Sequence, residues 1–208
     1  MTNNNNTKAV DVTITSDLMC PWCYVGLRKL QEASKVSGVD TNIVWKPFLL
    51  RPDLPEDGAP KGGTPSSRVP IHLRSAGESV GIDFTGLTSK TPNTILFHAT
   101  MKMLLENKVE QTPFQEEVFD AYFTQGIFPD RQVLLDCAKY AGVKEWVEQL
   151  YEDPKRLGRL RNEVMEEAQA ASYRGVSSVP FFEFNGNPAF SGAQDVQTFV
   201  RFLERHAE

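Results

Sequence analysis

Two of the three cysteines in this chain stand three positions apart, in the segment Cys20-Pro21-Trp22-Cys23. A close pair of thiols can exchange disulfides, bind a metal ion or simply pack in a protein interior. The third cysteine, Cys137, lies far along the chain, and the odd count does not fit the disulfide framework of a small secreted protein. The pair is therefore the first candidate for chemistry, and the elements around it decide which kind.

The local pattern places this pair at the start of a helix. Residues 10–15 alternate apolar and polar side chains, which predicts a strand, and a helix fits residues 21–35 with Gly38 as its stop. Cys20 would then lie where unpaired N–H groups and the helix dipole favour an anion. Because only a thiolate attacks a disulfide, this position predicts Cys20 as a nucleophile with a lowered pKa. Cys23, one turn further on, could resolve the mixed disulfide.

Two other interpretations of the pair have to be weighed. A structural zinc site needs four ligands, and the remaining cysteine and the three histidines form neither a second C-x-x-C nor an H-x₃₋₅-H pattern. We therefore expect no metal. A purely structural pair of thiols is the other alternative, and the location at a helix start weighs against it.

The C-terminal part of the chain supplies the second half of the predicted site. A short aromatic strand over residues 179–184, the turn Asn185-Gly186 and a return strand over residues 188–191 predict a hairpin, followed by a helix that Asp195 caps. Sequence alone favours a trans bond before Pro180. The order of elements along the chain, described in the next paragraph, is however that of a thioredoxin-like fold, in which the proline before this strand faces the active-site cysteines and is cis. Pro180 is therefore predicted to be cis, and the main chain of Val179 is predicted to pair with an extended ligand. An ordinary proline at the start of a strand is the alternative.

Between these two halves lies a long segment that looks helical. A second strand is predicted over residues 42–50, with Pro47 marking an edge strand or a bulge, and a loop over residues 52–65 follows. Thr91-Pro92, Thr112-Pro113 and Asp130 then look like helix starts. Without this segment the order is β-α-β-β-β-α. We therefore predict an α/β protein with a thioredoxin-like domain (residues 9–55 and 172–208), an all-helical insertion domain (56–171) and a disordered tail (1–8).

Several single residues could add to the site. His98, on a predicted helix, could face Cys20 and contact a substrate or move a proton, and Trp22 could offer a substrate an apolar contact. For each, local packing is an equal alternative. Asp17 could relay protons, although a turn or cap role is favoured. Cys137 is expected to be a buried apolar residue rather than a third redox thiol.

Composition narrows the function classes further. The net charge is -5, which argues against a nucleic-acid partner, since such a protein usually carries a basic stripe. We see neither a secretory leader nor an apolar run of the ~18 residues that span a bilayer, so no membrane partner is expected. The default expectation is a cytoplasmic protein, and a solvated helix face is the simplest interpretation of Arg156, Arg159 and Arg161.

Four stretches of the sequence are similar to one family. The segment Asp17-Leu18-Met19-Cys20-Pro21-Trp22-Cys23-Tyr24-Val25-Gly26 resembles the active-site segment of DsbA-like oxidoreductases of the FrnE type. Similarity to that family extends to WKPFLL at residues 45–50, to Asn93-Thr94…His98, and to GVSSVPFF at residues 175–182 followed by SGAQ at residues 191–194.

This resemblance implies a thioredoxin fold with an inserted helical domain, Cys20 as nucleophile, Cys23 as resolving thiol and Pro180 as the cis-proline. Related glutathione-using proteins, the kappa-class transferases and hydroxychromene-carboxylate isomerases, carry serine at the position of Cys20. The cysteine here therefore favours redox exchange. No cofactor is expected beyond the redox-active disulfide, although glutathione stays open as a reductant or ligand.

The function predicted from the sequence is thus a thiol–disulfide oxidoreductase that acts on disulfides or dithiols of proteins or small molecules. Two alternatives stay open. One is a glutathione-dependent transferase or isomerase acting on a small electrophile. The other is a redox-regulated binding or chaperone-like module, in which the two thiols act as a switch.

Overall fold

The structure is a computed structural model that describes residues 9–207, so the tail predicted over residues 1–8 lies outside it. One four-stranded sheet has the order β2-β1-β5-β6. The strands β1 (Val10–Ser16) and β2 (Thr41–Pro47) are parallel, whereas β5 (Phe181–Phe184) and β6 (Asn187–Ser191) form an antiparallel hairpin on the other side of β1. This is the mixed sheet expected of the predicted thioredoxin-like unit.

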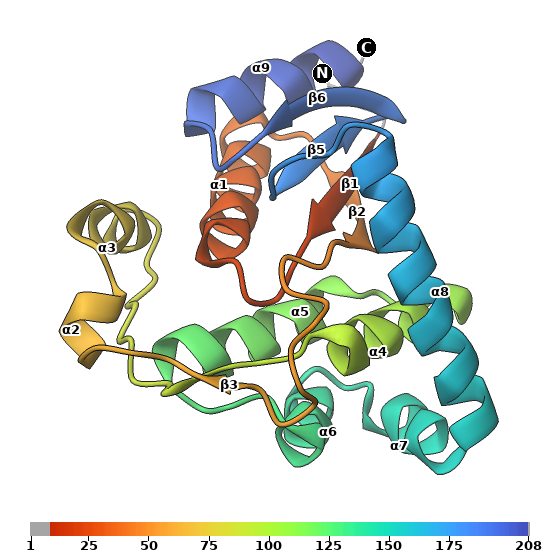
Figure 1. Cartoon of the computed structure of the whole chain (residues 1–208). Helices are drawn as coiled ribbons and strands as arrows, with labels where there is room; N and C mark the ends of the chain where they lie inside the picture. The colour runs from red at the N-terminus through yellow and green to blue at the C-terminus, as the bar shows by residue number, and fades with distance from the viewer. Residues whose placement is uncertain (1–8, 208) are drawn as a thin grey trace.

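Helices cover both faces of this sheet. The helices α1 (Pro21–Ser37) and α9 (Val196–Ala207) pack together on one face, while α4 (Ile95–Glu106) and α8 (Pro154–Tyr173) lie against β2 on the other side (Figure 1). Because both faces are covered, the last three residues of β1 are all buried, whichever face their side chains point to. The end of β1 is thus enclosed just before the chain reaches the cysteines.

The prolines in the sheet lie where their missing N–H groups are tolerated. Pro47 ends β2, and Pro188 lies in β6, and these two strands are the edges of the sheet. A register shift follows Phe182, where β5 pairs with β6. The position of Pro47 on an edge strand agrees with the prediction from the sequence, whereas the register shift was not predicted.

The segment between β2 and β5 is mainly helical; the helices of residues 95–152 lie below the sheet in Figure 1, whereas α8 rises alongside it. The segment also contains a two-residue antiparallel ladder, so it is not purely helical. In chain order its elements are β3 (Ala59–Pro60), α2 (Pro65–Arg68), α3 (Ile71–Glu78), β4 (Lys90–Thr91), α4, α5 (Thr112–Phe119), the π-helical turn η1 (Asp120–Thr124), α6 (Arg131–Tyr140), α7 (Lys144–Glu152) and α8. The boundaries 56–171 for an insertion domain stay a prediction.

Two helix starts in this segment differ from the prediction. Thr91 does not cap a helix, because it pairs with Ala59 in the β3–β4 ladder; α4 begins only at Ile95, whose N–H donates to Asn93 Oδ1 at 3.0 Å. Thr112 does not cap α5 either, because its hydroxyl accepts a hydrogen bond from Trp45 Nε1 at 3.1 Å. At both Thr91 and Thr112, the residue predicted to cap a helix instead makes a contact with a distant part of the chain.

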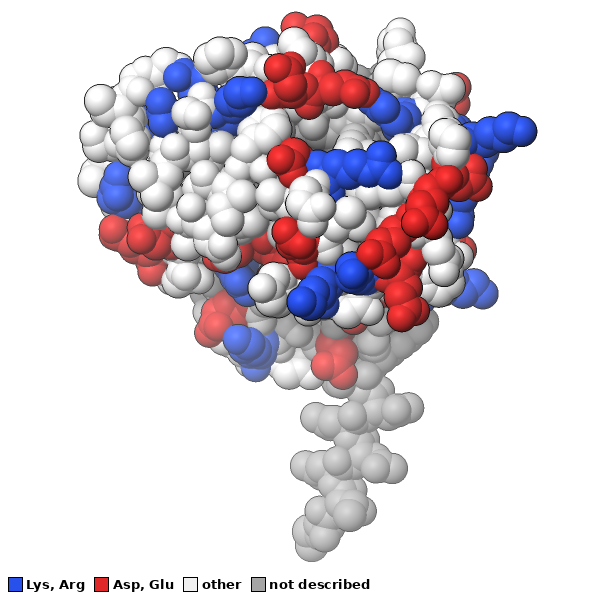
Figure 2. Space-filling model, turned by 90° about the horizontal axis from the view of Figure 1, so that it is seen from below, with Lys and Arg blue, Asp and Glu red and all other residues white. Residues whose placement is uncertain are grey.

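The surface seen from below carries Lys and Arg side chains interspersed with Asp and Glu, with no wide basic patch on that face (Figure 2). An ion-pair network also joins α4 and α8, in which Arg159 contacts both Glu106 and Glu163. No helix among residues 9–207 is long and apolar enough to cross a membrane.

Candidate active site

The turn from β1 into α1 holds the two cysteines. Cys20 is the N-cap residue of α1, with extended backbone angles (φ −91°, ψ 109°), and Pro21 follows in the first turn. The N–H of Cys20 donates to the carbonyl of Asp17 at 3.0 Å, and the N–H of Cys23 donates to the carbonyl of Cys20 at 3.0 Å. Both thiols are free in this structure and buried: Cys20 is 7 % exposed and Cys23 0 %.

The two thiols have opposite acidities. The pKa of Cys20 is lowered, chiefly because the Cys23 thiol donates a hydrogen bond to the Cys20 thiolate; the main-chain N–H groups of Cys23 and Trp22 add to this, while burial and the charge of Asp17 oppose it. The pKa of Cys23 is raised well above its usual value, first by burial and then by Cys20 itself. Cys20 is therefore the thiol that ionises first, as an attacking nucleophile must.

The predicted cis-proline lies directly across from this pair. The Val179–Pro180 peptide bond is cis, and the Cys20 thiol donates to the Val179 carbonyl, with Sγ and O 3.5 Å apart. The N–H of Val179 donates to no group among residues 9–207, whereas the Pro180 carbonyl is taken by the N–H of Gly192 at 2.7 Å. The Val179 main chain therefore has a free donor and a carbonyl beside the reactive sulfur.

Helix α1 approaches this proline closely at a glycine. A Cβ atom added to Gly26 would lie 3.1 Å from Pro180 Cγ and 3.1 Å from Phe182 Cζ, which is tighter than ordinary contact. Only a residue without a side chain lets α1 hold the cysteines this near to the proline. Gly26 was noted only as part of the family-like segment, and one sequence does not reveal that its neighbour is a ring 154 positions away.

The carboxylate of Asp17 accepts hydrogen bonds from the main chain of the turn that precedes Cys20 and of the segment that follows β2. Its side chain is fully buried; Oδ2 accepts from the N–H of Leu50 at 2.8 Å, and Oδ1 accepts from the N–H of Met19 at 3.4 Å. This is the turn role favoured from the sequence. His98 is also buried, and its Nε2 lies 3.5 Å from Asp17 Oδ1 without forming a hydrogen bond of ordinary geometry. The structure thus brings His98 to Asp17.

Ser16 is a neighbour of Cys23 that the sequence analysis missed. Its buried hydroxyl is one of the groups that counter the raised pKa of Cys23, although it makes no hydrogen bond of ordinary geometry. No motif marks a serine at the end of a strand. Ser16 lies next to Cys23 because the buried end of β1 is close to the start of α1, which only the structure reveals.

The remaining candidates make contacts away from the two thiols, and a substrate contact of Trp22 stays a prediction. The Trp22 ring is partly buried and stacks on His72 of α3, with ring centroids 6.0 Å apart, so it joins α1 to the helical segment. Cys137 is buried in α6, and burial raises its pKa to about 12. Arg161 pairs with Glu56, and Arg156 and Arg159 pair with Glu106 on the surface. Within residues 9–207 no group of three or more His, Cys, Asp or Glu could hold a metal ion.

Comparisons with known proteins agree with this geometry. Among curated proteins, the uncharacterized protein YwbO of Bacillus subtilis is 44% identical over 43 residues, a stretch that spans 21% of this chain and 20% of that protein. Among solved structures, a probable DsbA oxidoreductase, SCO1869 of Streptomyces coelicolor, superposes with a TM-score of 0.77 at 24% identity, covering 95% of this chain and 89% of the other.

A second solved structure, the cytosolic disulfide reductase DsbM of Pseudomonas aeruginosa with GSH, has a TM-score of 0.60 at 17% identity and covers 95% of each chain. At these identities the two structures show the fold alone. The family model of the DSBA-like thioredoxin domain matches residues 11–204, nearly the whole chain. This protein therefore belongs to the DsbA-like thioredoxin domain family.

Proposed function

We propose that this protein is a thiol–disulfide oxidoreductase of the FrnE type in which Cys20 attacks and Cys23 resolves. The observation that carries the proposal is the position of the Cys20 thiol, which lies at the N-cap of α1 between the Cys23 thiol and the Val179 carbonyl. Helix N–H groups and a thiol donor stabilise its anion, and a free main-chain edge lies beside it for a substrate.

The reaction can be followed sulfur by sulfur. The Cys20 thiolate attacks one sulfur of a substrate disulfide, the S–S bond breaks, and the second substrate sulfur leaves as a thiolate. Cys23 then loses its proton and attacks Cys20 Sγ, which releases the first substrate sulfur as a thiolate. The products are a substrate dithiol, reduced by two electrons, and a Cys20–Cys23 disulfide. Two molecules of a thiol such as glutathione return the latter to the reduced state and leave as their own disulfide.

Substrate recognition follows from the free groups at Val179. A peptide or peptide-like disulfide in extended form can accept from the Val179 N–H and donate to its carbonyl, as an added strand would. These contacts select for an extended main chain rather than for a particular sequence. The Cys20 thiol uses the same carbonyl when it is protonated, so ionisation of Cys20 frees that carbonyl for a substrate.

His98 is proposed to act through Asp17 rather than on a substrate. Asp17 raises the pKa of Cys20 by its charge, and the imidazole 3.5 Å from its carboxylate can offset that charge when it is protonated. A cytoplasmic location, like that named for the DsbM protein, favours reduction or isomerisation as the working direction.

The test uses single substitutions and a disulfide-bonded protein substrate such as insulin. Cys20→Ser is expected to abolish reduction, because no thiolate is left to attack. Cys23→Ser is expected to accumulate the mixed disulfide, visible as a covalent adduct by mass spectrometry, because resolution is blocked. Full turnover by Cys20→Ser, or no adduct with Cys23→Ser, would overturn the proposal.

A further inference from the structure

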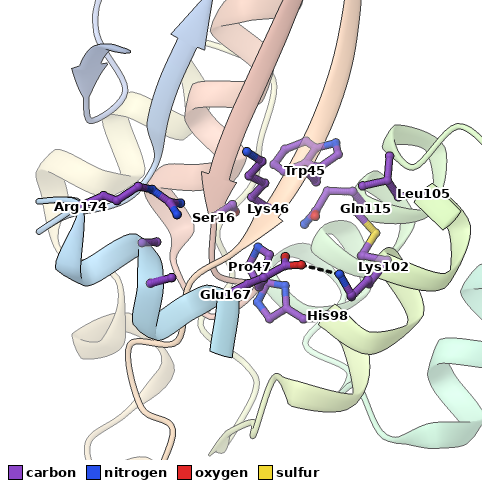
Figure 3. Close-up of a pocket in the computed structure, with 13 residues that line it drawn as sticks. Ser16, Trp45, Lys46, Pro47, His98, Lys102, Leu105, Gln115, Glu167 and Arg174 are labelled. Carbon is purple, nitrogen blue, oxygen red and sulfur yellow. Dashed lines mark hydrogen bonds and ion pairs between the residues drawn. The ribbon is translucent and has the colours of Figure 1, made fainter. Parts of the chain in front are cut away.

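A cavity of about 230 Å³ lies behind the reactive turn, under the ends of β1 and β2. Side chains reach it from the two strands, from α4 and α5 on one side and from the end of α8 on the other (Figure 3). It contains neither cysteine and is not part of the substrate face described above.

Three buried polar groups converge on this cavity. Within residues 9–207, the buried side-chain nitrogen and oxygen atoms without a hydrogen-bond partner are Ser16 Oγ, His98 Nε2 and Gln115 Nε2. All three residues line the cavity, and they are only 2 %, 5 % and 1 % exposed. A buried polar group without a partner costs about 1–3 kcal/mol, and native proteins rarely keep such groups without a reason. His98 Nε2 lies 3.5 Å from Asp17 Oδ1, so Ser16 Oγ and Gln115 Nε2, from two separate elements, are the groups that point to a polar occupant of this space.

The charges around the cavity define the sign of that occupant. Lys46 and Arg174 line it and have no carboxylate partner among residues 9–207, and Figure 3 shows the Arg174 guanidinium directed towards the middle of the group. Lys102 and the carboxylate of Glu167 also line it and pair with each other, and Lys102 pairs with Glu163 of α8 as well, so the lining carboxylate is already neutralised. Donors and unpaired cations thus outnumber the acceptors, which favours an anion.

The rest of the lining is apolar. Trp45, Met101 and Ala171 form part of the wall, so an occupant needs a carbon skeleton as well as a charge. A fully hydrated inorganic anion would leave these surfaces without a partner. The volume is enough for several waters or for a few carbon atoms with a head group.

We propose that this cavity is a binding site for a small organic acid. The carboxylate would accept hydrogen bonds from Gln115 and Ser16, near the imidazole of His98, and a short apolar tail would pack on Met101 and Ala171. Lys46 and Arg174 at the mouth attract the anion. The site does not depend on the proposed redox function, because none of its groups is a thiol.

Titration calorimetry of the reduced Cys20→Ser protein with butyrate tests this, with butyramide as a neutral ligand of the same shape and inorganic phosphate as an anion without a tail. Butyrate is expected to bind saturably and at least tenfold more tightly than the other two. Gln115→Leu removes a donor to a charged acceptor and is expected to weaken butyrate roughly ten- to a hundredfold.

Substituting one lysine that lines the cavity and one that does not distinguishes a direct contribution to butyrate affinity from an effect of the net charge. Lys46→Gln is expected to weaken butyrate severalfold, whereas Lys155→Gln, at an exposed lysine outside the cavity, is expected to leave it unchanged. Ser16→Ala serves as a second interior variant if Gln115→Leu does not fold. Equal affinity for butyrate and butyramide, preference for phosphate, absence of saturable binding, or unchanged affinity in the interior variant would overturn the proposal and leave ordered water as the occupant.

Discussion

The hydrogen bond from Cys23 to the Cys20 thiolate can be tested by replacing Cys23 in two ways. It is the largest of the contributions that lower the pKa of Cys20, ahead of the helix N–H groups. Cys23→Ser keeps a hydroxyl donor at the same place, whereas Cys23→Ala removes the donor and leaves the main chain intact. Neither variant can close the disulfide, so the acidity of Cys20 is measured without interference.

The size of the effect follows from the burial of the site. Cys20 is only 7 % exposed, so water cannot readily replace a lost donor. A hydrogen bond to a charged group contributes about 1.5–3 kcal/mol, which corresponds to roughly one to two pKa units. We therefore expect the pKa of Cys20 in Cys23→Ala to lie about one to two units above that in Cys23→Ser.

The assay is the pH dependence of alkylation by iodoacetamide, with thiolate absorbance near 240 nm as a second readout. Below both pKa values Cys23→Ala should react about ten to a hundred times more slowly than Cys23→Ser, and above both the rates should converge. The free energy of unfolding of the reduced protein should fall when the pKa of Cys20 is no longer lowered. A lowered pKa stabilises the reduced fold above the unfolded pKa of the thiol, and this is lost as pH falls through the folded pKa, so Cys23→Ala should lose part of it. Coincident alkylation profiles for the two variants would refute the role of the Cys23 donor.

Three further predictions concern other parts of the protein. Asp17→Asn removes a buried negative charge that raises the pKa of Cys20, so the same alkylation profile should move to lower pH; an upward move would contradict this. Cys137, with its pKa near 12, should resist iodoacetamide at pH 8 in the folded protein and react after denaturation, as mass spectrometry can show. Gly26→Val forces α1 away from the cis-proline and should lower both exchange rate and stability, the latter by about 1–3 kcal/mol. Gly158→Val, at a helical glycine with no atoms near its Cβ position, is the control and should do much less.

The elements that hold the cysteines could be predicted because their signals are local. The alternation in β1, the proline at the start of α1 and the stop at Gly38, with φ of 68°, all act within a few residues of one another. Cys20 at a helix N-terminus follows from these alone. The cis state of Pro180 needed a family resemblance, because sequence by itself favours trans.

The parts that escaped prediction depend on distant partners. Thr91 and Thr112 carry good capping side chains, yet one pairs in a ladder with Ala59 and the other binds the indole of Trp45. The contact of His98 with Asp17 was not predicted either, and a role of His98 towards Cys20 or a substrate stays a prediction. Such choices are made by tertiary packing, which competes with local preference and outweighs it where the side chain is buried.

The end of β1 forms a common wall between the reactive thiols and the proposed acid site. Ser16 neighbours Cys23 on one side and lines the cavity on the other, whereas the N–H of Cys20 donates to the carbonyl of Asp17, the residue after Ser16. A carboxylate bound beside Ser16 would therefore raise the pKa of Cys23 more than that of Cys20, because Coulomb interactions weaken with distance. We expect butyrate to slow resolution of a preformed mixed disulfide while leaving alkylation of Cys20 in Cys23→Ser nearly unchanged. If butyrate slowed both steps equally, the wall would not separate the two thiols in this way.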